Sequence, residues 1–420
     1  MLPFSRMKKN VFLWALYDFA NSIIMIVFLF YFSQWLVVDN GRPDWWYNAT
    51  LIVSSLLFII TAPIAARRLD LTGTKLAGVQ FFSLTMTTFY VLTAFITLFV
   101  PSYVLLATIL FTLATYFYLM SFVYYTPMMN DLTTDKNRGW VSGLGLGANY
   151  AGQVIGLIAT LPFATGAISL FGAPGRAQTF VPAIILFAIS ALPLLLWYKE
   201  KAAERTPVKT HVREELREVA RTVKTVFSIK NFLLLFVAYL LFSDALLTFS
   251  NNFPIFLEKV FGAPDDVKTY LTAGILTLSG VGSLVFGKIS DKTGTRSALT
   301  LVLSFWIVFF PVLAFAPSLQ VAAIVCLVAG LFFGPVWGIS RAMVSELTPR
   351  ETEARAFGFY TLAERFATFI GPITWSAILV ATSNSGNASY SYALVGMSIL
   401  TLLGLIVIRK IQPTKKETEI

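Results

Sequence analysis

Long apolar stretches recur along the whole chain and are separated by short polar segments. A helix needs about 20 mostly apolar residues to cross a membrane. Twelve stretches meet this requirement, at 11–38, 46–66, 75–100, 103–126, 140–165, 179–198, 231–258, 267–290, 296–316, 319–343, 355–380 and 389–409. The pattern therefore predicts an all-α polytopic membrane protein with twelve transmembrane helices.

Lys and Arg lie mostly on one side of this arrangement. With twelve spans both termini share a side, and the segments on that side hold 27 of the 32 Lys and Arg residues. The opposite loops hold Arg42, Arg176, Lys259 and Lys268, and Arg365 lies within a span. Because cytoplasmic loops carry an excess of basic residues, we expect both termini in the cytoplasm. We expect the plasma (inner) membrane as the host, and a vacuolar-type membrane is the alternative.

Composition supports this class and argues against others. The chain is 56% hydrophobic and 13% charged, with a mean hydropathy of +0.73. Its net charge of +10 follows from the topology, so we expect no nucleic-acid partner. His211 and Cys326 are the only residues of their types, which argues against disulfides within the chain and His/Cys metal clusters. We expect no enzymatic activity, cofactor or metal, and we expect the first apolar run to be a span rather than a signal peptide.

Two sequence segments occur twice, in the same order. "DLTGTK" at 70–75 matches "DKTGTR" at 291–296, and "DLTTDKNRGWVSG" at 131–143 matches "ELTPRETEARAFG" at 346–358. Repeats at such long spacing indicate two homologous six-span halves. The predicted organisation is an N-terminal bundle at 1–198, a cytoplasmic amphipathic linker at 199–230 and a C-terminal bundle at 231–420.

The first repeated segment has the composition of a tight turn. Its glycine permits a sharp reversal of the chain. Its acid can cap a helix end or pair with a nearby basic residue, and such ties would help to hold the inner mouth shut. We therefore interpret these turns as gating loops, with the candidate residues Asp70, Gly73, Lys75, Asp291, Gly294 and Arg296.

Asp18 stands inside the first apolar run. An aspartate at the centre of a transmembrane helix costs about 2.5 to 3.5 kcal/mol on translocon scales. Asn21 and Ser22 follow at helical spacings of three and four residues, so the three polar side chains share one face. Lipid cannot satisfy such groups, which predicts that this face is turned toward the bundle interior or a cavity.

Span 7 repeats this pattern. Asp244 aligns with Asp18, and Thr248, Asn251 and Asn252 follow it on one face. Pro254 removes a backbone hydrogen bond, so we expect it to kink or break the helix. A hydrogen bond within the core remains the alternative role for both aspartates.

Span 11 carries an acid and a base near mid-membrane, Glu364 and Arg365. A buried carboxyl that changes partners can take up and release protons, and it can also receive an amine, while an arginine can receive a carboxylate. We therefore take Asp18, Asp244, Glu364 and Arg365 as proton-coupling or substrate-binding candidates. The remaining cavity-lining candidates are Asn21, Ser22, Thr248, Asn251, Asn252, Asn149, Gln153, Tyr118 and Tyr125. Glycines at small-residue spacing in span 5 favour close helix packing.

Two six-span halves joined by a linker resemble the major facilitator superfamily. The two repeated turns resemble its loop 2–3 signature and the loop 8–9 copy. "WALYDFANS" in span 1, "GLGLGANYAGQVIGL" in span 5 and "GFYTLAERFATFIGP" in span 11 resemble the branch of fungal vacuolar, autophagy-related amino-acid effluxers and their bacterial relatives. The resemblance implies that spans 1 and 7 line one central cavity, which Asp18 and Asp244 would both face.

These observations favour a secondary active transporter that works by alternating access and moves a small polar solute, with an amino acid as the first hypothesis. We expect proton coupling, a lipid bilayer around the protein and a monomer. A drug or lipophile exporter of the same fold is the nearest alternative. A membrane receptor or scaffold that does not transport is the alternative from another class.

Overall fold

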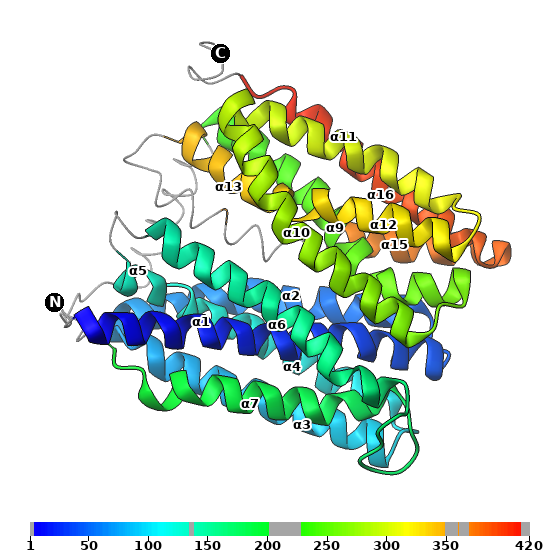
Figure 1. The fold of residues 1–420 in the computed structure, drawn as a ribbon, viewed down its shortest axis with the longest axis horizontal. Helices are drawn as coiled ribbons and strands as arrows, with labels where there is room; N and C mark the ends of the chain where they lie inside the picture. Colours follow the sequence, from blue (N-terminus) through cyan, green and yellow to red (C-terminus); the bar gives the residue numbers. More distant parts are fainter. Residues whose placement is uncertain (1–3, 134–137, 201–227, 349–359, 361–368, 413–420) are drawn as a thin grey trace. The chain divides into compact units, whose positions relative to one another are not determined.

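The computed structural model describes the chain except for residues 1–3, 134–137, 201–227, 349–359, 361–368 and 413–420 (Figure 1). All secondary-structure elements in the described part are helices. Eleven of them, with adjoining helical pieces counted together, are long and apolar enough to cross a membrane, and Ile370–Ala381 is a shorter apolar helix. This confirms the predicted all-helical class. Of the predicted span at 355–380, most of 355–368 lies outside the described residues.

The helices of the first half follow the predicted apolar runs. They are α1 (Phe4–Val27), η1 (Phe28–Phe32), η2 (Trp35–Asp39), α2 (Asp44–Thr72), α3 (Lys75–Phe99), α4 (Val104–Tyr125), α5 (Met128–Leu132), α6 (Arg138–Ala164), η3 (Arg176–Thr179) and α7 (Phe180–Trp197). The segments η1 and η2 are π-helical and continue α1, so the first span runs over Lys8–Asp39.

The second half contains the remaining helices. They are α9 (Lys230–Phe261), α10 (Asp265–Thr293), α11 (Thr295–Ala314), α12 (Leu319–Phe333), α13 (Pro335–Leu347), α15 (Ile370–Ala381), η4 (Ser383–Ser385) and α16 (Ala388–Ile408). The helix α9 runs unbroken through Pro254, so the expected break is not found. Neighbouring helices can support a transmembrane helix that has lost one backbone hydrogen bond to proline.

The chain forms two compact units. Unit 1 contains residues 1–207 and 264–273, and unit 2 contains 208–263 and 274–420. The boundaries proposed for the linker fall largely on residues that the structure does not describe, and they stay a prediction. We call the helix end that the basic loops predict to be cytoplasmic the inner end, and the opposite end the outer end.

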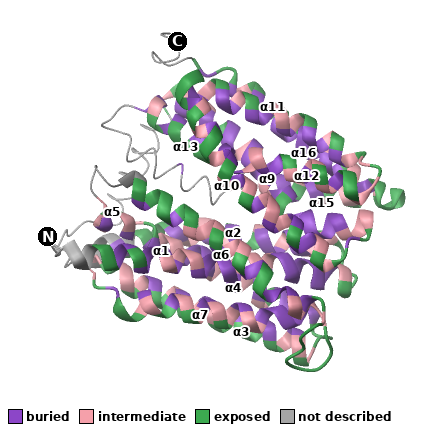
Figure 2. Ribbon diagram, in the orientation of Figure 1, coloured by how far each residue is buried: buried purple, intermediate pink, exposed green. Residues whose placement is uncertain are grey.

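The helices α1 and α9 are the central helices of their units. α1 packs against α6 and α7, and α9 packs against α16 and α15. Within an apolar window of 18 residues, 67% of the residues are buried in the first span and 61% in α9. In α3 the buried share is 33% (Figure 2). The two helices that carry the intramembrane aspartates therefore have the environment in which an unpaired charge is costly.

Glycines allow α6 to approach α1 closely. A Cβ atom at Gly152 would lie 2.3 Å from the backbone oxygen of Phe19, and one at Gly156 would lie 3.1 Å from the Cα of Ile23. A Cβ at Gly145 would lie 2.7 Å from the Trp14 ring. The small-residue stripe thus packs against the helix that carries Asp18, as expected for close packing in membranes.

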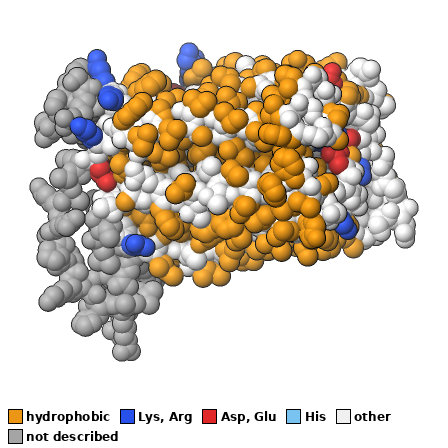
Figure 3. Space-filling model, turned by 90° about the horizontal axis from the view of Figure 1, so that it is seen from below, with side chains coloured by type: hydrophobic (Ala, Val, Ile, Leu, Met, Phe, Trp, Pro, Cys, Tyr) orange, Lys and Arg blue, Asp and Glu red, His pale blue; other side chains and the backbone are white. Residues whose placement is uncertain are grey.

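Hydrophobic side chains dominate the outer surface of the helices. On the face drawn in Figure 3 they form a broad field along the helix sides, while the charged side chains gather near the helix ends. Large apolar residues stay highly exposed at these positions, for example Leu84 at 71% and Leu284 at 74%. Such a surface is stable in lipid and matches the membrane class predicted from the sequence.

Candidate functional site

Asp18 begins a short chain of hydrogen-bonding groups between α1 and α6. The side-chain amide of Asn149 donates to Oδ1 of Asp18 at 3.4 Å, and the amide of Gln153 donates to Oδ1 of Asn149 at 2.7 Å. All three side chains are half-buried. The structure therefore brings together one acid of span 1 and two cavity-lining candidates of span 5. The Asn149 amide stabilises the charged carboxylate by donation and still leaves it partly accessible.

Asn21 and Ser22 lie further along the same helix and are almost fully buried. Among the described residues, neither amide atom of Asn21 nor the hydroxyl of Ser22 has a hydrogen-bond partner. The hydroxyl of Thr115 on α4 shares this property. Buried polar groups are nearly always hydrogen-bonded, and the buried hydroxyls of Tyr17 and Tyr90 are the neighbours of Asn21 and Thr115. The polar face of α1 is therefore turned toward the interior of unit 1, and a wet cavity beside it stays a prediction.

The two candidate tyrosines of span 4 are buried. Tyr125 donates its hydroxyl to the backbone oxygen of Trp14 at 2.8 Å and stacks on that indole with ring centroids 5.4 Å apart. Tyr118 makes an edge contact with the ring of Phe122. Tyr125 thus links α4 to α1 one helical turn before Asp18. These contacts indicate that Tyr125 positions the two helices relative to each other.

Asp244 has a different environment in unit 2. Its carboxylate is 1% exposed, and Oδ2 accepts hydrogen bonds from the backbone N–H of Gly371 at 2.8 Å and of Phe369 at 3.2 Å. These groups belong to the start of α15, whose first residue is Ile370. An acid at a helix N-terminus satisfies free N–H groups and complements the helix dipole. Asp244 therefore caps a helix that begins inside an apolar stretch.

The other candidate residues of span 7 differ in burial and in their contacts near this cap. Thr248 is buried, and a Cβ atom at Gly371 would lie 2.2 Å from its hydroxyl oxygen. Asn252 is buried and donates its amide to the backbone oxygen of Thr248 at 2.9 Å, within its own helix. Asn251 is half-buried. Glu364 and Arg365 lie outside the described residues, so their placement beside Asp18 or Asp244 stays a prediction.

At the inner ends, the repeated segments make corresponding contacts in the two units. In unit 1, Nζ of Lys75 lies 2.5 Å from the carboxylate of Asp131. In unit 2, the hydroxyl of Thr295 donates to Glu346 at 2.7 Å. Asp131 and Glu346 occupy the same position in the repeat. Each unit thus ties its two inner loops together through the acid that opens the second repeated segment.

The two glycines of these turns have left-handed backbones. Gly73 ends α2 with φ +65°, and Gly294 precedes α11 with φ +83°. Arg296 donates to the backbone oxygen of Arg409 at 2.7 Å, and Asp291 is exposed. The side chain of Asp70 is outside the described set. These contacts lie within one unit, which fits a structural role and leaves the proposed gating role as a prediction.

A further carboxylate supports the inner end of unit 1. The two oxygens of Glu200 accept the backbone N–H groups of Lys75 at 2.6 Å and Leu76 at 3.3 Å, so this acid caps α3. Burial raises the pKa of the neighbouring Tyr198 phenol, and the charges of Asp131 and Glu200 raise it further. Tyr198 therefore stays protonated at neutral pH.

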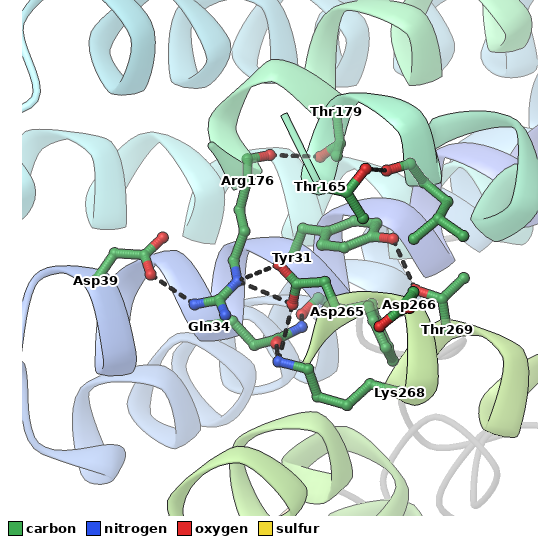
Figure 4. A network of polar contacts seen from close by, with 12 residues as sticks. Tyr31, Gln34, Asp39, Thr165, Arg176, Thr179, Asp265, Asp266, Lys268 and Thr269 are labelled. Carbon is green, nitrogen blue, oxygen red and sulfur yellow. Dashed lines mark hydrogen bonds and ion pairs between the residues drawn. The ribbon is translucent and has the colours of Figure 1, made fainter. Parts of the chain in front are cut away.

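A polar network at the outer end of unit 1 was not predicted from the sequence (Figure 4). The guanidinium of Arg176 lies 2.5 Å from Asp39 at the end of the first span and 3.1 Å from Asp265 at the start of α10. Arg176 itself stands at the start of η3. Three segments that are distant in sequence are therefore held by one bidentate side chain.

Lys268 completes this network. Its side chain is fully buried, and Nζ lies 2.8 Å from Asp265 and donates to the side-chain oxygen of Gln34. Next to it the hydroxyls of Tyr31 and Thr269 are 2.9 Å apart. The sequence contained one signal for this site. Arg176 and Lys268 are two of the four basic residues in the otherwise base-poor outer loops.

Several bacterial proteins have a related sequence. An uncharacterized protein of Aquifex aeolicus is 25% identical over 415 residues, which is 97% of this chain and 98% of that protein. The uncharacterized MFS-type transporter YxiO of Bacillus subtilis is 22% identical over 441 residues, which is 99% and 97% of the two chains. Multidrug resistance protein 2 of Bacillus subtilis is 24% identical over 291 residues, or 68% of each chain.

Solved transporter structures have the same fold. A mutant of the nucleoside transporter NupG superposes with a TM-score of 0.76 at 10% identity, over 96% of this chain and 100% of that one. A D-xylose-proton symporter gives a TM-score of 0.69 at 16% identity, over 98% and 99%. The fold and these relatives define an MFS-type transporter, an integral multi-pass membrane protein. The family model described as vacuole effluxer Atg22 like matches residues 130–419, and the chain belongs to this family.

Proposed function

We propose that this chain is a proton-coupled secondary transporter that moves a small polar solute, in the first place an amino acid, by alternating access. The observation that carries the proposal is the pair Asp18 and Asp244. They occupy matching positions in the repeat and lie on the most buried helix of each unit. A carboxylate in such a position is costly, and proton relays and substrate sites are its usual reasons.

The two aspartates have complementary roles in this proposal. Asp18 is half-buried and held by a long amide contact, so it can exchange Asn149 for a substrate amine or a proton. Asp244 accepts hydrogen bonds from two backbone N–H groups. In this proposal a change in its protonation would alter these contacts with the start of α15. Arg365 is the proposed receiver of a substrate carboxylate. An amino acid carries both of these charges, which is why we place it first.

Transport into proteoliposomes tests the proposal. The purified chain and the variants Asp18→Asn and Asp244→Asn would receive a labelled amino-acid mixture, with and without an imposed proton gradient. We expect gradient-driven uptake by the native chain and at least a tenfold loss in both variants. Asp266→Asn is the matched control, because Asp266 is an exposed aspartate at the start of α10. Uptake with an unchanged pH profile in both site variants would refute the coupling role.

The nearest alternative is export of drugs or other lipophiles. The 24% identity with Multidrug resistance protein 2 and the many aromatic residues favour it. Competition separates the two proposals, since zwitterions would compete for an amino-acid site and lipophilic cations for an exporter site. A receptor that does not transport would bind solute in detergent and show no gradient-dependent flux.

A further inference from the structure

A cavity of about 380 Å³ opens on unit 1 between the inner parts of α2, α3 and α4. Its lining is mainly apolar and includes Ile64, Ala77, Phe81 and Phe82. One charged residue, Arg68, also lines it. The volume lies within the range of small-molecule sites, so the cavity can hold a substantial apolar group.

The floor of the cavity depends on one glycine. A Cβ atom at Gly78 would lie only 2.0 Å from the ring of Tyr124, so this ring reaches α3 only because position 78 has no side chain. Tyr124 donates its hydroxyl to the backbone oxygen of Ala65 at 3.1 Å, and its ring centroid lies 5.5 Å from that of Phe82. Contacts from three helices thus fix the floor. In the repeat, Gly78 corresponds to Leu299.

The rim of the cavity lies where lipid must cover it. Ile64 is 68% exposed and Phe81 is 61% exposed. The membrane-spanning part of α2 ends at Ala66, so the exposed Arg68 stands two residues further, at the level expected for lipid headgroups. The cavity therefore has an apolar body at acyl-chain depth and a guanidinium at headgroup depth.

We infer that this cavity is a binding site for an anionic phospholipid of the inner leaflet. An acyl chain would fill the apolar groove over Phe82 and Tyr124, and the phosphate would pair with Arg68. A guanidinium matches phosphate geometry by bidentate hydrogen bonding. The site is separate from the proposed transport path. It adjoins that path through α4, because Tyr125, the residue after Tyr124, bonds to the backbone of α1 at Trp14.

Lipid titration of the detergent-purified full chain tests this inference. Native mass spectrometry would count bound phosphatidylglycerol and, separately, phosphatidylcholine. We expect tighter binding of phosphatidylglycerol. Arg68→Gln should weaken it roughly fivefold, the usual effect of one basic residue at an anionic membrane surface. Ala77→Phe should also weaken it, because a ring at this exposed lining position fills the groove and leaves the charge in place.

Lys288→Gln is the matched control. Lys288 is an exposed basic residue at the inner end of α10, next to the corresponding repeated turn of unit 2. We expect this variant to bind phosphatidylglycerol like the native chain. Equal losses in Lys288→Gln and Arg68→Gln would indicate general charge attraction and overturn the inference. Native-like binding in both Arg68→Gln and Ala77→Phe, or equal affinity for phosphatidylcholine, would overturn it as well.

Discussion

Asp18 and Asp244 occupy the same position of the repeat and are held by different partners. Asp18 receives a side-chain amide that can rotate away. Asp244 receives two backbone N–H groups that cannot leave without moving the start of α15. The first aspartate is therefore suited to exchanging partners, and the second is suited to linking its charge state to the position of a helix.

This contrast predicts a graded response at Asp244. Asp244→Asn keeps one acceptor oxygen for the N–H groups of Phe369 and Gly371, whereas Asp244→Leu keeps none. Leaving buried donors without an acceptor costs about 1–3 kcal/mol. We expect Asp244→Leu to lower the thermal unfolding temperature in detergent clearly more than Asp244→Asn, and we expect both to lose gradient-driven uptake. Equal unfolding temperatures for the two variants would contradict the capping role.

Between elements, the contact of α1 with α6 leaves almost no space at Gly152. Any side chain there would collide with the backbone oxygen of Phe19, which has no rotamer to change. Overpacking of a tight core typically costs about 1–3 kcal/mol. We expect Gly152→Val to reduce the stability of the protein by this amount, as measured by thermal unfolding in detergent.

Gly147 provides the control for this prediction. It lies on the same helix, and a Cβ atom there would have no neighbouring atom within 4 Å outside the local helix. Gly147→Val should therefore unfold close to the native temperature. If Gly152→Val were as stable as Gly147→Val, the close approach of the two helices would not contribute to stability.

At the scale of the whole molecule, the outer network attaches residues 264–273 to unit 1, although the chain on both sides belongs to unit 2. Asp265 contacts both Arg176 and the fully buried Lys268. Removal of one partner from a buried ion pair costs about 3–5 kcal/mol, because it leaves the other charge uncompensated. We expect Asp265→Asn to lower the unfolding temperature strongly. Asp266→Asn, one residue away and exposed, should not, and similar losses in both would contradict the network's role.

Hydrophobic periodicity and the internal sequence repeat predicted the features that depend on one helix at a time. They located the spans and the polar face of Asp18 with Asn21 and Ser22. They did not predict that Asp244 caps α15, because the apolar run 355–380 predicts one continuous span although Gly371 and Pro372 mark a helix start. They also missed the network of Arg176, which depends on how an outer loop folds over two helix ends.

Residues 264–273 belong to unit 1 although they follow the linker in the sequence. This has a consequence for a gene that is divided at the linker. A fragment that encodes the chain only up to the linker would carry Arg176, Gln34 and Asp39 without the acid and the lysine that complete their network. Such a fragment would have to acquire this piece from a separately made second fragment. The repeat looks like two equivalent copies in the sequence, but a piece of the second copy completes the network of the first.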